Sequence, residues 1–270
     1  MTLAQKYYNI QTQSNMHIHP RHRAILDLLE EKGEVRVSDL CGRFSVSEMT
    51  IRRDLAELER SGLLRRIHGG AVNARGRSYE PPFLSRAGAH QFQKERIGKL
   101  AADLIHDGES IALDVGTTTL EIARALKERS NLNLTIITAS LHITNVLANS
   151  PGIRLIVVGG VLRFGELSLV GHLAERAFRE FYVDKLFLGV GGISLEAGLT
   201  EFNLEDALVK QAMLKTAKER YVVADSSKLG RIAFTHIAPL NDVHVLITDS
   251  EANEKVIQAL REHGLRVMLA

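Results

Sequence analysis

The sequence predicts two domains, a small α+β domain over residues 20–75 followed by an α/β domain with a mostly parallel sheet over residues 93–270. Near the start of the chain, three short helical patterns precede a basic, glycine-containing hairpin. Beyond residue 93, short runs of Val, Ile and Leu alternate with helical patterns, which is typical of a parallel sheet covered on both faces. Residues 76–92, which include Pro81-Pro82, are expected to form a linker between the domains.

Composition excludes several classes of protein. Hydrophobic residues make up 45% of the 270 residues and charged residues 24%, the profile of a globular chain with its own core. Because Cys41 is the single cysteine, neither a disulfide framework nor a multi-cysteine metal site is possible, and no metal site is expected. The chain has no apolar run of about 18 residues and no apolar signal region at its start, so we expect a cytoplasmic protein that does not enter a membrane.

The first domain begins with two helices. Pro20 suits the first turn of a helix that Gly33 ends, and residues 35–37 are short and extended. Ser38 is expected to be the N-cap of a second helix, which a turn at residues 45–47 closes.

A third helix is expected over residues 48–61, with Ser47 as its N-cap. Its apolar residues recur at helical spacing and form one buried stripe, Ile51, Leu55 and Leu58. After this helix, residues 63–67 and 71–72 are expected to pair as strands around a turn at Gly69-Gly70. Three helices followed by a hairpin form the pattern of a winged helix-turn-helix domain.

This pattern predicts a surface that binds DNA. An α-helix fits the major groove, where side chains of its first turns meet the base edges. Residues 43–77 contain eight arginines and four acidic residues, and arginine holds phosphate or guanine with two parallel donors. A helical hairpin for protein contacts is the alternative, but it explains the paired arginines poorly. The residues expected to contact DNA are Ser47, Glu48, Met49, Thr50, Arg52, Arg53, Arg65, Arg66, His68 and Gly69.

The second domain is expected to alternate strands and helices. The strands are expected at residues 110–113, 134–138, 153–158, 185–190, 221–224, 243–247 and 266–269. The helices are expected at about residues 93–104, 120–129, 141–149, 173–181, 204–218 and 253–263. In such sheets ligands bind at the carboxyl ends of the strands, and small polar residues follow several of these strands.

The segment Asp114–Thr119 is the clearest candidate for a ligand site. Gly116 lets a ligand approach the backbone, the three threonines bring hydroxyl and N–H groups to a helix start that suits phosphate, and Asp114 can accept sugar hydroxyls. A capping segment without a ligand is the alternative. Further candidates are Thr117, Thr118, Thr119, Thr138, Ser140, Gly159, Gly160, Glu205, Asp206, Lys210 and Lys228. For Asp206 and Lys210 the alternative is an exposed ion pair between neighbouring helical turns.

Several of these segments together resemble the DeoR-type bacterial repressors of sugar metabolism. The similar segments are Ser47–Leu55, Arg66–Ala71, Asp114–Thr119, Gly159-Gly160, Phe187–Gly189 and Asp225–Lys228. The resemblance covers residues 20–270. It implies a winged-helix repressor of a carbohydrate-utilisation operon whose sensor domain is similar to ribose-5-phosphate isomerase. It also implies operator DNA as a partner, a phosphorylated sugar as effector with no other cofactor, and a homodimer or homotetramer that suits repeated operator half-sites.

The chain departs from the family pattern at several positions. Ala139 stands where the family often has Asn, residues 200–203 replace a common Thr-Thr-Pro-Asn, Asp206 stands for a usual Glu, and Gln211 for a usual Arg. The change to Gln211 removes a charge and a bidentate donor, so the effector is expected to differ from the commonest ones.

Two other functions stay open at this point. The first is a sugar-phosphate isomerase-like enzyme with an accessory N-terminal domain, in which Lys228 would bind phosphate and one carboxylate would act as general base. The candidate bases are Asp114, Asp184, Glu205 and Asp206. The second is an activator of transcription rather than a repressor. The winged helix argues against the enzyme, because an isomerase needs no arm that reads DNA, and no catalytic residue is assigned.

Overall fold

The structure is a computed structural model that describes residues 19–32, 34–60, 63–73, 76–129 and 132–270. The chain divides into two units, Met1–Gly76 and Arg77–Ala270. Gly33, Ser61 and Gly62 lie outside the described residues, so the predicted ends of the first and third helices are not seen. No helix among the described residues is long and apolar enough to cross a membrane.

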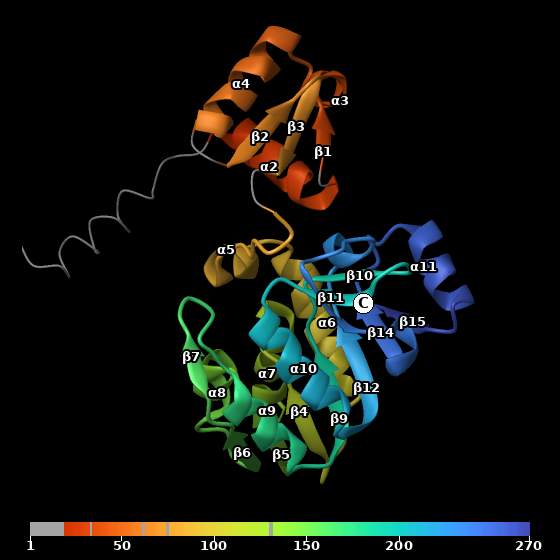
Figure 1. The fold of residues 1–270 in the computed structure, drawn as a ribbon. Helices are drawn as coiled ribbons and strands as arrows, with labels where there is room; N and C mark the ends of the chain where they lie inside the picture. Colours follow the sequence, from red (N-terminus) through yellow and green to blue (C-terminus); the bar gives the residue numbers. More distant parts are fainter. Residues whose placement is uncertain (1–18, 33, 61–62, 74–75, 130–131) are drawn as a thin grey trace, which may run out of the picture. The chain divides into compact units, whose positions relative to one another are not determined.

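Among the described residues of the first unit, three helices pack with a three-stranded sheet (Figure 1). The elements are α2 (Pro20–Lys32), β1 (Glu34–Arg36), α3 (Val37–Phe44), α4 (Glu48–Arg60), β2 (Leu64–Ile67) and β3 (Gly70–Asn73). The sheet has the order β1-β3-β2 with antiparallel pairs. The stripe predicted on α4 is buried together with apolar residues of α2, α3 and the sheet. The helix-turn-helix domain predicted from the sequence is therefore confirmed.

The predicted cap of the second helix was wrong. The helix α3 begins at Val37, directly after Arg36, so Ser38 lies inside its first turn. The Ser38 hydroxyl donates to the carboxylate of Asp39 at 3.2 Å rather than capping the helix.

The predicted hairpin turn was displaced by one residue. Ile67 pairs with Gly70, so the two loop residues are His68 and Gly69, and Gly69 has a φ of 81°. Gly70 is the first residue of β3, where a Cβ atom would lie 2.1 Å from the carbonyl oxygen of Val35. Glycine at position 70 is therefore what lets β1 approach β3.

A seven-stranded sheet forms the centre of the second unit, in the order β15-β14-β12-β9-β4-β5-β6. Every pair of neighbours in it is parallel. The strands are β4 (Ser110–Leu113), β5 (Leu134–Thr138), β6 (Ile153–Val157), β9 (Val183–Leu188), β12 (Ala217–Val223), β14 (Val245–Thr248) and β15 (Arg266–Leu269). The chain runs from β4 through β5 to β6 and then returns to β9 on the other side of β4. The strand order thus reverses between β4 and β9.

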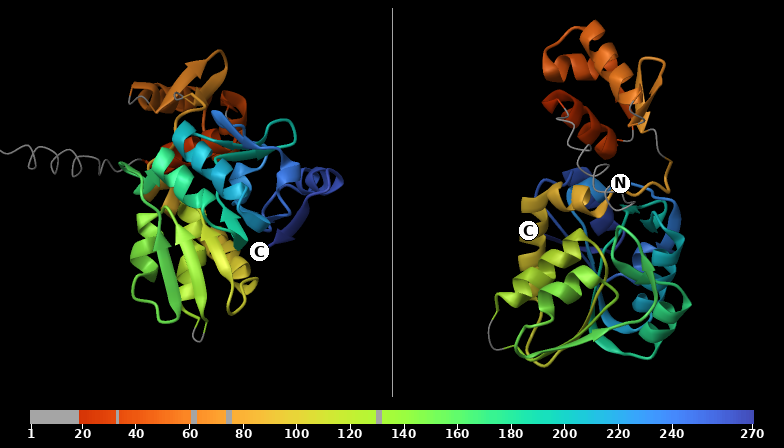
Figure 2. Two further views of the ribbon diagram at one scale, coloured as in Figure 1. Left: turned by 60° about the horizontal axis from the view of Figure 1, so that its bottom comes forward. Right: turned by 90° about the vertical axis from the view of Figure 1, so that its left-hand side faces the viewer.

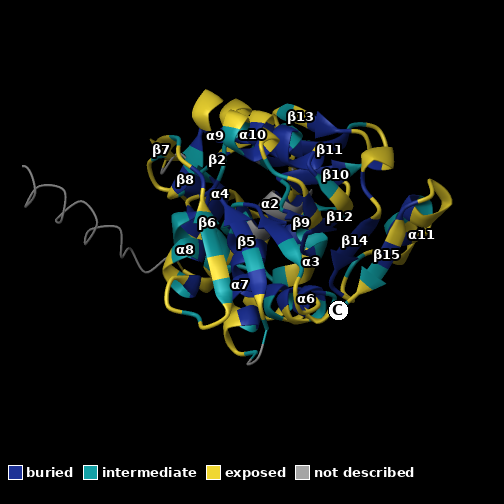
Figure 3. Ribbon diagram, turned by 90° about the horizontal axis from the view of Figure 1, so that it is seen from below, coloured by how far each residue is buried: buried dark blue, intermediate teal, exposed yellow. Residues whose placement is uncertain are grey.

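Helices cover both faces of this sheet (Figures 1 and 2). One face carries α5 (Phe83–Gly88), α6 (Gln91–Asp103), α7 (Thr117–Lys127) and α8 (Leu141–Leu147). The other carries α9 (His172–Arg179), α10 (Leu204–Leu214) and α11 (Glu254–Glu262). Successive residues of one strand serve the two cores, since Ile111 and Leu113 belong to the first cluster and Ala112 to the second. At the edge of the sheet, β6 has exposed positions (Figure 3).

Several elements of the second unit were not predicted. They are the hairpin of β7 (Val161–Arg163) and β8 (Ser168–Val170), the small antiparallel sheet of β10 (Gly192–Ser194), β11 (Gly198–Glu201) and β13 (Thr235–Ala238), and two short 3-10 helices, η1 (Ser226–Lys228) and η2 (Leu240–Asp242). The helix expected over residues 204–218 ends at Leu214, because β12 already begins at Ala217. The segment expected to be a linker contains α5 and the start of α6, and its Phe83 is buried in the core of the second unit.

Candidate functional site

The start of α4 is fixed by its cap. The Ser47 hydroxyl oxygen accepts a hydrogen bond from the backbone N–H of Thr50 at 3.3 Å, which confirms the predicted N-cap. The two hydroxyl groups of these residues also lie 3.0 Å apart. The cap satisfies a backbone donor that would otherwise lack an intrahelical partner.

The first turns of α4 present exposed side chains on the face opposite the buried stripe. Met49 is 79% exposed, and Glu48, Arg52 and Arg53 are exposed as well, while Thr50 is half-buried. Arg52 lies 3.2 Å from the Glu48 carboxylate one turn earlier, a surface ion pair that costs little to exchange for a phosphate. Of the predicted DNA-contacting residues of this helix, Glu48, Met49, Arg52 and Arg53 are therefore accessible.

Asp54 follows these arginines but has a structural role. It is buried, and it accepts from Arg21 of α2 through Nε at 2.6 Å and lies 3.1 Å from Nε2 of His22. Burial would raise the pKa of the Asp54 carboxyl, but the hydrogen bonds and charges of Arg21 and His22 hold it below its usual value. The carboxylate thereby joins α4 to α2.

One of the four predicted contact residues of the hairpin, Arg66, is paired with a side chain of α4. Arg66 is bound to Glu59 of α4, with Nε 2.7 Å from one carboxylate oxygen and its backbone N–H donating to the other at 2.8 Å. Arg65 and His68 are exposed, and Gly69 forms the tip. Arg66 therefore links the hairpin to α4 by a pair at the surface.

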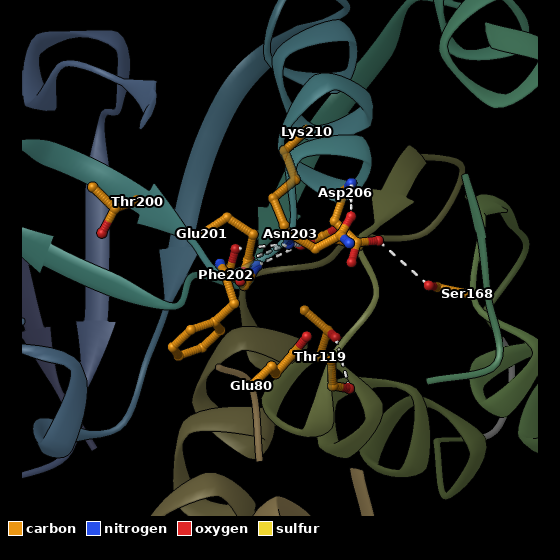
Figure 4. A network of polar contacts seen from close by, with 12 residues as sticks. Glu80, Thr119, Ser168, Thr200, Glu201, Phe202, Asn203, Asp206 and Lys210 are labelled. Carbon is orange, nitrogen blue, oxygen red and sulfur yellow. Dashed lines mark hydrogen bonds and ion pairs between the residues drawn. The ribbon is translucent and has the colours of Figure 1, made fainter. Parts of the chain in front are cut away.

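Lys210 lies at the centre of the second candidate site, at the point where the strand order reverses. Its side chain is 3% exposed and extends from α10 to the carboxyl ends of β4 and β9. There the Lys210 ammonium donates to Asp114 and, at 3.0 Å, to the carbonyl oxygen of Gly189. It also lies 3.4 Å from Glu201 (Figure 4). Gly189 in turn donates its N–H to Asp114 at 2.9 Å. Open α/β sheets bind ligands at this reversal.

The charges of Lys210, Asp114 and Glu201, which we call the Lys210 group, depend on one another. Burial alone would lower the pKa of Lys210, but the carboxylates of Asp114 and Glu201 outweigh it and hold the pKa above its usual value. Burial raises the pKa of the Glu201 carboxyl, which Lys210 only partly opposes. Lys210 is therefore held as a cation among carboxylates.

Asp206 lies on the same helix as Lys210 but has other partners. Its carboxylate binds Arg163 and accepts from the Ser168 hydroxyl at 3.3 Å, and its backbone N–H is capped by the Asn203 side chain at 3.0 Å (Figure 4). Both Asp206 and Lys210 are buried. The alternative of an exposed ion pair between them was therefore wrong.

The start of α7 lies beside β4. Gly116 precedes it with a φ of 139°, a conformation that favours glycine, and no side-chain hydrogen bond caps this start. Thr117, Thr118 and Thr119 form its first turn and are buried, with the Thr119 hydroxyl donating to the carbonyl oxygen of Gly116 at 3.1 Å. Backbone N–H groups at such a start suit an anion.

Three cations lie on elements near these strand ends. Lys228 and Arg231 approach the Phe202 ring at 6.0 and 5.0 Å from its centre. Lys94 of α6 is 4% exposed and donates to the carbonyl oxygens of Ala89, at 2.6 Å, and Arg86. The pKa of Lys94 is lowered to about 8, chiefly by burial; the charge of Asp225 opposes this shift and that of Lys228 contributes to it.

Sequence reasoning did not single out Lys94, Arg163 or Glu201. For Lys94 a signal existed, since it stands on the apolar face of its helix, three residues before Ile97 and seven before Ala101. Arg163 and Glu201 end strands of three and four residues, and no periodic pattern marks them. Glu201 was noted only within the segment that departs from the family pattern.

Comparison with known proteins gives the family. Residues 21–75 match the DeoR-like helix-turn-helix domain and residues 89–250 match the DeoR C terminal sensor domain. The chain belongs to the DeoR family. It is 37% identical over 247 residues to YulB, an uncharacterised HTH-type transcriptional regulator of Bacillus subtilis, covering 92% of this chain and 95% of the relative. It is 33% identical over 249 residues to the glycerol-3-phosphate regulon repressor of Escherichia coli, covering 92% and 98%.

Among solved structures, part of this DeoR-family chain is similar to ribose 5-phosphate isomerase A of Methanocaldococcus jannaschii. The TM-score is 0.40 and the identity 21%, over 52% of this chain and 55% of the isomerase.

Other predicted ligand residues of the DeoR-family sensor unit bond to the backbone, are exposed, or pack closely against β8. Ser140 caps α8 through the N–H of Ile143 at 3.3 Å, and the Thr138 hydroxyl oxygen accepts from the N–H of Ser140 at 3.1 Å. Glu205 and Gly159 are exposed, and a Cβ at Gly160 would lie 2.8 Å from the backbone of β8. Within the described ranges, no three His, Cys, Asp or Glu side chains are grouped to hold a metal ion.

Proposed function

We propose that this chain is a DNA-binding repressor of a carbohydrate-utilisation operon and that a phosphorylated sugar releases it from its operator. The observation that carries the proposal is the combination, in one chain, of an exposed α4 start with a sensor unit whose buried Lys210 is surrounded by carboxylates at the strand-order reversal. The named relatives include repressors of a glycerol-3-phosphate regulon and of an aga operon.

The DNA contacts proposed for the first unit follow from exposure. Arg53 and Arg52 would bind phosphates or guanine edges, while Glu48, Met49 and Thr50 would face the bases from the major groove. Arg65, Arg66, His68 and Gly69 of the hairpin would contact the adjacent backbone or minor groove. We expect a homodimer or homotetramer in the cytoplasm, because two recognition helices match repeated half-sites.

The effector contacts proposed for the sensor unit follow from charge. The start of α7, at Thr117–Thr119, offers N–H donors to a phosphate, and Lys94 and Lys228 would add positive charge. Near Lys210 the carboxylates outnumber the cation, which suits sugar hydroxyls better than phosphate. Asp114, Glu201 and Asp206 would then accept hydroxyl hydrogen bonds.

Release from DNA would follow from linkage. A sugar phosphate that binds the DNA-incompetent arrangement more tightly than the competent one shifts the population toward the former. An effector that bound both arrangements equally would leave operator affinity unchanged, however tightly it bound.

The test is fluorescence anisotropy of the pure protein on DNA from upstream of its own operon, with scrambled DNA as control, over a salt series. Glycerol 3-phosphate and a panel of pentose and hexose monophosphates serve as effectors. Selective binding that one sugar phosphate abolishes is the expected result. Equal binding to scrambled DNA would contradict the regulator, because that is only the sequence-independent phosphate contribution. Selective binding without response to any sugar phosphate would contradict the effector class, and an isomerase assay on the same panel would then test the enzyme alternative.

A further inference from the structure

Arg163, at the end of β7, holds two carboxylates that come from distant parts of the sensor unit. One guanidinium nitrogen binds Asp206 of α10, and the other lies 2.7 Å from Glu80, which precedes α5. Glu80 and Arg163 are 83 residues apart in the sequence, and Asp206 and Arg163 are 43 apart. A planar guanidinium can hold two carboxylates in this way, whereas a single ammonium offers no fixed fork.

The chain of charges continues beyond Glu80. Its second oxygen lies 2.9 Å from Arg86 of α5, and Arg86 also binds Glu166 in the loop of the β7–β8 hairpin. The Nε of Arg86 donates to the carbonyl oxygen of Pro81 at 2.9 Å. The order Asp206, Arg163, Glu80, Arg86, Glu166 thus alternates in sign. We call these five residues the ionic chain.

The ionic chain is mostly shielded from water. The side chains of its five members are between 5% and 21% exposed. A charged side chain that is shielded from water and loses its partner is left uncompensated, which is energetically costly. The loss of one ion pair therefore favours rearrangement of the neighbouring ion pairs. Loss of the Asp206 carboxylate would therefore leave Arg163 bound to Glu80.

Asp206 and Glu80, the two carboxylates that Arg163 binds, lie in different surroundings. Asp206 lies one helical turn before Lys210 and is hydrogen-bonded to Ser168, within the region proposed for the effector hydroxyls (Figure 4). Glu80 lies shortly after the boundary between the two units at residue 76. Residues 77–88 are the part of the sensor unit that the chain reaches directly from the DNA-binding unit.

We propose that Arg163 is a positioning residue that transmits effector occupancy from Asp206 to Glu80 and so to residues 77–88. The inference rests on the proposed function for the identity of the effector. A sugar hydroxyl that hydrogen-bonds to Asp206 weakens the hold of Asp206 on Arg163. The guanidinium then moves toward Glu80, and the pairing between Glu80 and Arg86 changes with it. The orientation of α5 and of the segment before it is altered as a result.

The first test needs no effector. Amide hydrogen exchange of the full-length protein is measured over α5 in wild type, Asp206→Asn, Arg163→Gln and the double variant. We expect Asp206→Asn to change exchange at residues 83–88 by at least threefold, and to cause no further change once Arg163 is already Gln. Unaltered exchange over α5 in Asp206→Asn, or an equal effect in both backgrounds, would overturn the proposal whether or not a sugar phosphate is the effector.

The second test uses the effector response. Binding of the sugar phosphate that wild type recognises is measured by calorimetry, and its effect on operator affinity by anisotropy. We expect Arg163→Gln and Arg163→Lys to bind the effector with an affinity within about threefold of wild type. The factor by which the effector lowers operator affinity should be at least tenfold smaller in these variants than in wild type. Glu80→Gln should have the same effect. A full response in all three variants would overturn the proposal and leave the proposed function standing.

The matched control is Arg179→Gln, which breaks an exposed ion pair with Glu175 on α9 of the same unit. It should retain both effector binding and release. If wild type itself responds to no sugar phosphate, the proposed function fails, and the hydrogen-exchange test still decides the role of Arg163.

Discussion

Arg21 of α2 holds both carboxylate oxygens of Asp54 on α4, through Nε at 2.6 Å and through a terminal nitrogen at 3.1 Å. Asp54 directly follows Arg52 and Arg53 in the sequence. The two arginines are exposed, whereas the aspartate is buried against α2. The helix turns by about 100° per residue, and this rotation points the arginines outward while the aspartate faces the first helix. A charged run thus contributes both to the DNA-binding face and to the packing that orients it.

Replacement of Asp54 should destabilise the DNA-binding unit. Asp54→Ala leaves Arg21 without its carboxylate partner, and we expect a loss of about 2 kcal/mol in the free energy of unfolding. Calorimetric unfolding of the full chain measures this, and the transition of the sensor unit should not move. Glu48→Ala, at an exposed position of the same helix, should stay within about 0.5 kcal/mol of wild type. Equal stability of the two variants would show that the Arg21 pair contributes nothing.

Replacement of Arg53 should weaken operator binding without affecting the sensor. Arg53→Ala removes an exposed guanidinium from the early turns of α4, and we expect a loss of about tenfold or more in operator affinity. If the contact is to phosphate, the slope of affinity against salt should also fall by about one. Arg60→Ala, at the other end of α4, is the control and should bind normally. If only Arg60→Ala lost operator affinity, the C-terminal end of α4 rather than its first turns would contact the DNA, and the assignment of Arg53 would be wrong.

The repetitive part of the fold was predictable from the sequence. Apolar stripes on the helices and runs of Val, Ile and Leu in the strands result from burial, and a strand was predicted at each of the seven places along the chain that form the parallel sheet. The order of these strands within the sheet was not predicted. The small antiparallel sheet and the β7–β8 hairpin were not, because their strands have only three or four residues and show no repeating pattern. The start of α3 was misplaced because a serine can satisfy its hydroxyl on a neighbouring carboxylate as readily as on a helix start.

The candidate sensor site was only partly predictable. Asp114, Asp206 and Lys210 were singled out, but their pairing was not, because spacing along one helix favours an ion pair within it. In the fold, Lys210 instead reaches Asp114, which is 96 residues away, and Asp206 binds Arg163 on another element. Burial of the whole group decides these partners, and burial depends on how the helix packs on the sheet.

Replacement of Asp114 should abolish the effector response. Asp114→Asn keeps the size of the side chain and an acceptor for the Gly189 N–H, but it removes the negative charge that holds Lys210. We expect effector affinity to fall by at least tenfold while operator affinity stays unchanged. Calorimetry with the sugar phosphate and anisotropy on the operator measure the two. Glu205→Gln, at an exposed position of α10, is the matched comparison. A normal response in Asp114→Asn would remove this carboxylate from the site.

Because of Lys94, the free energy of unfolding of the sensor unit should increase with pH in the alkaline range. Burial lowers its pKa to about 8 in the folded protein, whereas the unfolded chain has the usual value near 10.5. Between these values the unfolded state binds a proton that the folded state does not, so stability rises with pH in this window and is constant below it. The full change is roughly 3 kcal/mol.

The measurement compares wild type with Lys94→Met, which keeps the apolar stem but cannot titrate. Urea unfolding of the sensor unit is followed from pH 7 to pH 10. Relative to the variant, wild type should gain stability above pH 8 and show a constant difference below it. Lys99→Met, at an exposed position on the same helix, should give a curve parallel to wild type over this range. Parallel curves for Lys94→Met as well would mean that Lys94 has the same proton affinity in the folded and unfolded states, and that its contacts with the carbonyl oxygens of Ala89 and Arg86 offset its burial.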